Sequence, residues 1–184
     1  MDEPSRNGKT SIISENIRIR HPEYFTVGEY SIIDDYCYFS SEVFVGRCSH
    51  IASGCSVAGG LKESFHLGNF CSLSSGVKIW CASDDFVNDL VTIIPPKVKE
   101  QIKENFLVGG VRIQDYCAIG ANAVIMPKND IPIGVSIGAL SFVPVNYKFK
   151  EWSVYAGNPL RYIKERNKDS VRRQAEKLEI ELKK

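Results

Sequence analysis

The 184-residue sequence lacks any long apolar run, and its positive and negative charges nearly cancel, leaving a formal net charge of +1. No stretch approaches the roughly 20 apolar residues that span a bilayer. The polar start, Met1–Lys9, has no apolar segment of the kind found in a signal peptide. The charge balance indicates no basic surface for nucleic acid. These absences predict a cytoplasmic protein that partners neither a membrane nor a nucleic acid.

Histidine is scarce, and closely paired cysteine is absent. The chain has three histidines, His21, His50 and His66, and six cysteines without a Cys-x-x-Cys pair. Four cysteines fall on a regular spacing described below: Cys37, Cys55, Cys71 and Cys117. This spacing favours slim buried core residues over a disulfide framework or a zinc site.

Large apolar residues, almost all aliphatic, recur every six positions, with breaks only between Val57 and Leu67 and between Ile79 and Ile113. The positions are Val27, Ile33, Phe39, Val45, Ile51, Val57, Leu67, Leu73, Ile79, Ile113, Ile119, Ile125, Ile131, Ile137, Val143 and Phe149. A helix repeats near 3.6 residues and a strand every 2, so this period fits neither as a simple element. It predicts a solenoid whose short faces each bury one large residue at the same place.

A second series of small or slim residues stands four positions after the first. It comprises Ser31, Cys37, Val43, Ser49, Cys55, Cys71, Val77, Cys117, Ala123, Val135 and Ser141. One large and one small inward residue per hexad would fill a narrow prism without voids. The residue just after the large one is often Gly, Asp or Ala, as at Gly28, Asp34 and Ala52. Such residues suit a sharp corner between two short strands.

This pattern resembles the hexapeptide-repeat, left-handed parallel β-helix proteins. The resemblance covers about residues 25–149 and the tail Tyr155-Ala156-Gly157-Asn158-Pro159. It implies an all-β solenoid, and its left-handed crossovers follow from the family because the general preference is right-handed. We expect an N-terminal lead-in over residues 1–24 and a β-helix over residues 25–150, with loop insertions at about 58–66 and 80–106. The C-terminal segment 151–184 should contain an amphipathic helix over about 165–184.

The resemblance also implies a reaction. Members with a looped-out insertion and a terminal Ala-Gly-Asn-Pro mostly transfer an acyl group from coenzyme A (CoA), as homotrimers with sites between subunits. Residues 155–163 look like that terminal motif. Acyl-CoA, with acetyl-CoA as the expected donor, would be a co-substrate, without a tightly bound cofactor. The γ-carbonic-anhydrase branch needs three histidine ligands, two of them close in sequence, and His50 and His66 are too far apart, so no metal is expected.

Asp84 stands where the O-acetyltransferases of this superfamily carry a catalytic histidine, five residues after the inward Ile79. A sugar hydroxyl is a poor nucleophile that needs a strong base, whereas a carboxylate can orient an amine without being one. Asp84 therefore favours N-acylation over O-acylation. The alternative, an aspartate that only caps a turn, stays open.

Residues 49–54 together with 83–86 are similar to a subset of the superfamily found among aminosugar and O-antigen-type acyltransferases, which implies lipopolysaccharide biosynthesis. Counting faces places His50 and His66 at two different corners, His66 at the corner of Asp84. We predict Asp84 and His50 as catalytic residues. The predicted substrate-binding residues are Asp85, His66 and Phe86. A structural role for each histidine stays open.

The donor site is expected along the later coils, where small residues let backbone groups approach the pantetheine. Its residues are Gly120, Ala121, Gly138 and Ala139. The CoA phosphates should find Lys148, Arg161 or Lys164. The family often has a Thr-Lys pair shortly after its last hexads, and this chain has Pro144-Val145 there instead.

The predicted function is CoA-dependent N-acylation of the amino group of a nucleotide-linked deoxyaminosugar by a homotrimer. Two alternatives stay open. One is an O-acetyltransferase of a sugar hydroxyl on the same fold, with His50 or His66 as the base. The other is a non-catalytic trimeric assembly module that would not bind CoA.

Overall fold

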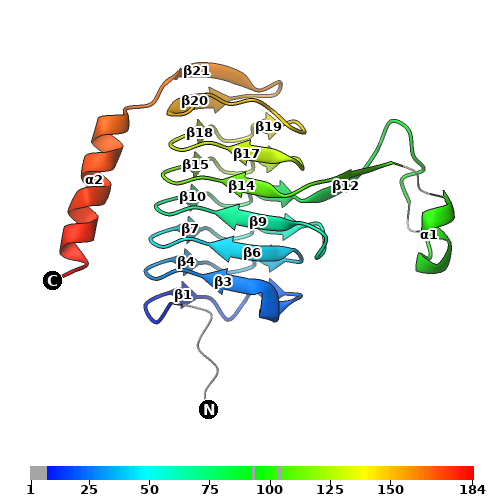
Figure 1. Ribbon diagram of the computed structural model, residues 1–184, viewed down its shortest axis with the longest axis horizontal. Helices are drawn as coiled ribbons and strands as arrows, with labels where there is room; N and C mark the ends of the chain where they lie inside the picture. The colour runs from blue at the N-terminus through cyan, green and yellow to red at the C-terminus, as the bar shows by residue number, and fades with distance from the viewer. Residues whose placement is uncertain (1–7, 93, 103–104) are drawn as a thin grey trace, which may run out of the picture.

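A computed structural model describes residues 8–92, 94–102 and 105–184 of the chain. These residues form a β-solenoid of about seven turns, in which short strands stack into three parallel sheets (Figure 1). The all-β solenoid predicted from the six-residue period is confirmed.

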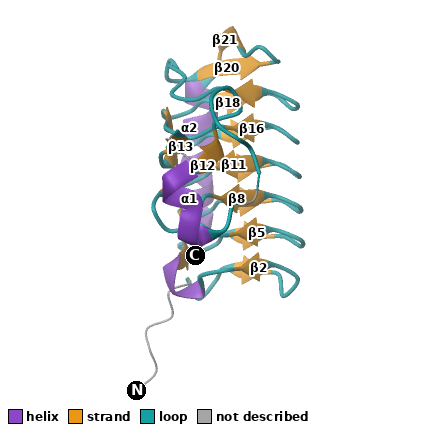
Figure 2. Ribbon diagram, turned by 90° about the vertical axis from the view of Figure 1, so that its right-hand side faces the viewer, coloured by secondary structure: helices purple, strands orange, loops and turns teal. Residues whose placement is uncertain are grey.

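The three sheets are the faces of the prism, and the chain visits them in the repeating order A, B, C. Sheet A contains β3 (Phe25–Val27), β6 (Glu42–Val45), β9 (Ser64–Leu67), β14 (Val111–Ile113) and β17 (Asn129–Ile131). Sheet B contains β1 (Ile12–Ile13), β4 (Ile32–Ile33), β7 (His50–Ile51), β10 (Ser72–Leu73), β15 (Ala118–Ile119), β18 (Ser136–Ile137), β20 (Ser153–Ala156) and β21 (Arg161–Glu165). Sheet C, seen as one column in Figure 2, contains β2 (Arg18–Ile19), β5 (Tyr38–Phe39), β8 (Ser56–Ala58), β11 (Lys78–Trp80), β16 (Val124–Ile125) and β19 (Phe142–Val143).

Both residue series predicted to point inward do so. Every large residue of the series from Val27 to Val143 is at most 4% exposed, and Phe149 packs against the core partly buried. The small series is buried throughout, including its serines. The Ser31 hydroxyl donates to the Gly46 carbonyl (2.7 Å) and the Ser49 hydroxyl to the Gly68 carbonyl (2.8 Å), so neither buried group lacks a partner. All six cysteines are free thiols, and the four of the small series lie in the core as predicted.

The corner glycines serve close packing between coils rather than an unusual backbone angle. A Cβ on Gly46 would lie 2.6 Å from the carbonyl carbon of Gly68 in the next coil. The positive φ angles fall two residues later in the corner, at residues other than glycine such as Cys48 (52°), Phe70 (54°) and Tyr116 (62°). The sharp turn predicted at the Gly, Asp or Ala that follows the large residue therefore falls on a later residue of the corner.

The ends of the solenoid differ from the expected layout. Within the expected lead-in, β1 pairs in parallel with β4 and β2 with β5, so these strands belong to the first coil, and a 3-10 helix (Pro22–Tyr24) precedes β3. At the other end β21 pairs antiparallel with β20 and closes sheet B.

The C-terminal helix α2 (Lys168–Glu181) begins later than expected because β21 extends to Glu165. It runs along the side of the stack rather than over its end (Figure 1). An ion pair between Glu179 and Arg47 ties it to the corner between sheets A and B. Arg166, just before the helix, donates to the carbonyl oxygens of Tyr116 and Gly134 at the same corner.

Both loop insertions leave the corner where sheet C passes to sheet A. The first joins β8 to β9 through Gly59 and Gly60, which both have positive φ. The second contains an antiparallel hairpin of β12 (Ala82–Asp84) and β13 (Phe106–Val108), with α1 (Pro96–Ile102) beyond it. The hairpin projects from the stack in Figure 1. Across the described residues, no helix is long and apolar enough to cross a membrane.

Candidate active site

Asp84 is carried outward by the projecting hairpin. It ends β12 and pairs with Phe106 on β13, and its side chain is half-buried. The base of the hairpin is fixed to the core by the buried Cys81, whose carbonyl accepts from the Gly109 N–H (3.0 Å). Asp84 therefore stands about three residues, or roughly 10 Å, from the prism wall.

Asp85 is hydrogen-bonded within its own loop. Its Oδ1 accepts from the backbone N–H groups of Val87 (2.8 Å) and Asn88 (3.2 Å), and its Oδ2 accepts from Asn88 Nδ2 (2.8 Å). These hydrogen bonds, with the Asn88 side chain contributing most, lower the pKa of Asp85. Asp85 thus caps a turn, while the neighbouring Phe86 is exposed. The substrate-binding roles of both residues stay predictions.

His50 lies on the outer face of β7 in sheet B, so the corner position predicted from the sequence is wrong. Its Nε2 is 2.8 Å from Asp34 Oδ2 on the preceding coil. Sheet B is the face opposite the corner from which the Asp84 hairpin leaves. Within one protomer the core of the prism therefore separates His50 from Asp84.

His66 lies on the outer face of β9 in sheet A, beside the corner of the hairpin, and again not at the corner itself. Its ring stacks on Phe44 with centroids 4.5 Å apart, and its Nε2 is 3.0 Å from the Ser64 hydroxyl. Burial first and the Arg112 charge second lower the pKa of His66, and Glu42 partly opposes them. The imidazole is therefore neutral near pH 7.

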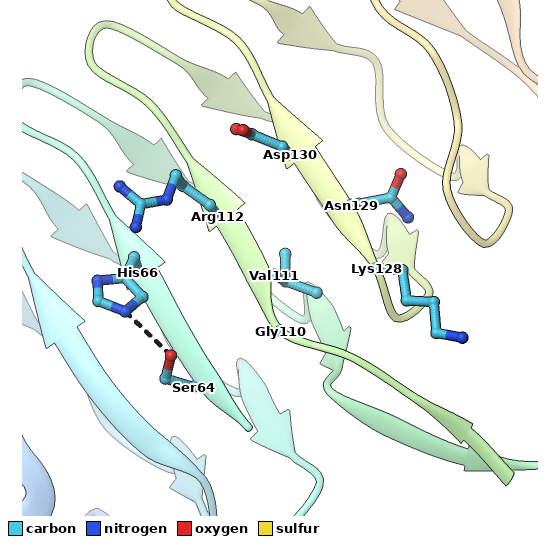
Figure 3. A pocket seen from close by; sticks show the side chains of 8 residues that line it. All are labelled: Ser64, His66, Gly110, Val111, Arg112, Lys128, Asn129 and Asp130. Atoms are coloured by element: carbon cyan, nitrogen blue, oxygen red, sulfur yellow. Dashed lines mark hydrogen bonds between the residues drawn. The ribbon is translucent and has the colours of Figure 1, made fainter. Parts of the chain in front are cut away.

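A cavity of about 320 Å³ opens on sheet A beside His66 (Figure 3). It is lined by Ser64, His66, Gly110, Val111, Arg112, Lys128, Asn129 and Asp130. Among these residues only His66 was predicted from the sequence. The signal was present in the hexads, because His66, Arg112 and Asp130 each stand one position before an inward residue and so face outward in register.

The predicted donor residues fall into two places. Gly120 and Gly138 stack at the corner between sheets B and C, where a Cβ on Gly138 would lie 2.9 Å from the Cβ of Ala156. Arg161 pairs with Ala156 across β20 and β21, so it lies at the end of this glycine column, and Lys164 pairs with Val154 on the same strand. Lys148 lies past β19, one position before the inward Phe149, so it faces outward on the side of sheet A, with its Nζ 2.8 Å from Asn146 Oδ1.

The described part of the chain brings together no group of three or more His, Cys, Asp or Glu side chains that could hold a metal ion.

Comparison with known proteins places the chain in a family. No family model matches the sequence. The structure superposes with a TM-score of 0.82 on a point mutant of AntD, an N-acyltransferase from Bacillus cereus, solved in complex with dTDP-4-amino-4,6-dideoxyglucose and CoA. The two share 32% identity over 94% of this chain and 89% of that one. A dTDP-4-amino-4,6-dideoxy-D-glucose acyltransferase from Escherichia coli is 26% identical over 85% of this chain and 82% of that protein.

A maltose O-acetyltransferase from Clostridium difficile shows the same fold with a TM-score of 0.56 at 23% identity, covering 88% of this chain and 69% of that one. The fold and the shared sequence thus define a left-handed β-helix acyltransferase of the hexapeptide-repeat class. Within that class the chain belongs to the N-acyltransferase family that includes AntD. It is an enzyme that uses a CoA thioester as co-substrate, as predicted.

Proposed function

We propose that the protein acylates the 4-amino group of dTDP-4-amino-4,6-dideoxyglucose, or of a closely similar dTDP-linked aminosugar. The broader prediction, N-acylation of a nucleotide-linked deoxyaminosugar, is confirmed by the likeness to AntD, and the O-acetyltransferase alternative is the weaker one. The observation that carries the proposal is that this likeness extends over 94% of the chain.

The chemistry needs only modest help from the protein. The amine attacks the thioester carbonyl, and backbone N–H groups at a coil corner stabilise the oxyanion. The CoA thiolate leaves and takes the proton that the amine loses, so a strong base is not obligatory. Asp84 holds the amine in orientation, and His50 assists with proton transfer or substrate orientation. These roles agree with an aspartate on a projecting hairpin and a half-exposed histidine paired with Asp34.

The placement of the two predicted catalytic residues favours a homotrimer with shared sites. His50 and Asp84 lie on opposite sides of one prism, so they meet at one substrate only if they come from different copies. A hairpin that projects from the stack, as in Figure 1, can reach a neighbouring prism. The cytoplasmic location and the link to lipopolysaccharide biosynthesis stay predictions.

We expect acetyl transfer to dTDP-4-amino-4,6-dideoxyglucose and far slower transfer to the matched dTDP-6-deoxyglucose, which has a hydroxyl in place of the amine. The reason is that Asp84 offers no strong base for a hydroxyl. Release of the free CoA thiol measures both rates under identical conditions. Faster acylation of the hydroxyl sugar would mean that the enzyme is an O-acetyltransferase.

The phosphates of CoA should bind at the end of the glycine column. We expect that Arg161→Ala and Lys164→Ala each raise the KM for acetyl-CoA several-fold, with the KM for the aminosugar unchanged, because a charged hydrogen bond contributes about 1.5–3 kcal/mol when fully formed. Lys177→Ala, on the exposed part of α2, is the matched control. An unchanged acetyl-CoA KM in both variants would remove these residues from the donor site.

A further inference from the structure

The cavity on sheet A is built by a gap in a regular grid of side chains. His66, Arg112 and Asp130 form one row across β9, β14 and β17. The preceding row runs from Ser64 through Gly110 to Lys128. Gly110 contributes no side chain to its row, so the floor of the cavity is backbone, and Arg112 and Lys128 flank it (Figure 3).

The two cations of this cavity lack protein partners among the described residues, whereas Asp130 in the cavity and Glu63 beside it accept hydrogen bonds from the protein. Asp130 Oδ1 accepts from Gln114 Nε2 (3.0 Å), and Glu63 Oε2 accepts from the Gly110 N–H (3.0 Å). Neither the Arg112 guanidinium nor the Lys128 ammonium makes a hydrogen bond or ion pair with any other described residue. Two cations left unpaired beside a polar concavity indicate an anionic ligand.

We propose that this cavity binds phosphate groups of a substrate, with Arg112 and Lys128 as the cationic partners and the Ser64 hydroxyl as a further donor. Two substrates carry such groups, the nucleotide-linked sugar and CoA, and the position of the cavity favours the diphosphate of the sugar nucleotide. This inference rests on the proposed function.

The position follows from the chain itself. Gly110 stands four residues after Phe106, the partner of Asp84 on the hairpin. That is at most roughly 13 Å along an extended strand, an upper limit that includes the shorter span of one sugar ring and one phosphoester link between the amino group and the diphosphate of a nucleotide-linked hexose. The glycine column predicted to hold CoA lies at a different corner, between sheets B and C. One nucleotide-linked sugar can therefore place its amine at Asp84 and its diphosphate at Arg112.

The kinetic test uses Arg112→Gln and Lys128→Met, with Arg18→Gln on the exposed face of β2 as the control. The expected result is a rise of about ten- to hundred-fold in the KM for the aminosugar nucleotide in each cavity variant. The KM for acetyl-CoA should not change. A rise in the acetyl-CoA KM alone would overturn the assignment to the sugar nucleotide, and unchanged values for both substrates would overturn the site.

A second readout does not depend on activity. dTDP should bind the wild-type enzyme more tightly than thymidine does. Arg112→Gln should remove most of that difference in affinity without lowering the affinity for thymidine. Bound dTDP should also raise the pKa of His66 in an NMR titration, because an anion beside Arg112 offsets the charge that disfavours protonation. If dTDP leaves the His66 titration unchanged, the phosphates bind elsewhere.

The two arms separate the failure of this inference from that of the proposed function. If the Arg112→Gln variant acylates the aminosugar nucleotide with normal kinetics, the proposed function stands and the phosphate site is wrong. If the enzyme binds dTDP through Arg112 but acylates no aminosugar, the phosphate site stands and the proposed substrate is wrong.

Discussion

Asp84→Asn is expected to lower kcat/KM for the aminosugar nucleotide by about ten- to hundred-fold. Asparagine keeps the size of the side chain and most of its hydrogen bonding but loses the charge that attracts an ammonium group. A charge-assisted bond of this kind contributes roughly 1–3 kcal/mol. Steady-state rates with one aminosugar acceptor measure the loss, and Asp169→Asn in the exposed first turn of α2 is the matched control.

Three companion variants decide what the carboxylate does. Asp84→Ala should be at least as slow as Asp84→Asn. His50→Asn should cost less than Asp84→Ala if the CoA thiolate is the final proton acceptor, and more if His50 is the base. Asp84→His should keep some activity and open slow acylation of a hydroxyl acceptor, because related O-acyltransferases carry histidine there. Wild-type rates in both Asp84→Asn and Asp84→Ala would end the amine-orienting role.

The same variants test whether the site is shared between copies. Asp84→Ala and His50→Asn protomers, unfolded together and reassembled, should form mixed trimers more active than either variant alone. The reason is that some interfaces then combine an intact Asp84 with an intact His50. Activity that never exceeds that of the separate variants would place the site within one protomer, where His66 is the nearer histidine.

The sequence predicted the solenoid well because its hexads repeat one physical demand. Each face must bury a large residue such as Ile119 and a slim one such as Cys117, and a slip of one position would expose both. The same alternation also corrects the predicted positions of His50 and His66. A residue just before an inward one faces outward on a strand, so His50 and His66 lie on faces rather than at corners.

The rest depended on contacts between distant segments, which no local pattern contains. The antiparallel β21 and the sideways course of α2 depend on pairing with β20 and on the Arg47–Glu179 contact. The cavity on sheet A exists because Ser64, Arg112 and Lys128 meet from three coils around the missing side chain of Gly110. The spacing from Ile79 was enough to single out Asp84, but the hairpin that carries Asp84 could not be predicted from the sequence.

Ile119→Asp should have the largest effect of any single substitution considered for this chain. Ile119 is 1% exposed and lies in register between Leu73 and Ile137 in the core of sheet B. An aspartate there finds no polar partner, so it is either buried as an unpaired charge or protonated at a cost, and a hole remains beside it. We expect a loss of more than about 4 kcal/mol in the free energy of unfolding.

Such a loss is a large share of the roughly 5–15 kcal/mol that stabilises a typical domain. Ile119→Asp should therefore be unfolded or aggregated by circular dichroism. Ile119→Val, which removes one methylene, should fold and lose about 0.5–1.5 kcal/mol in chemical denaturation. Ile12→Asp is the control, because Ile12 lies in the same sheet with its side chain 62% exposed. A soluble Ile119→Asp variant with wild-type stability would mean that the inward register of the hexads is wrong, since only an outward-facing side chain tolerates the charge.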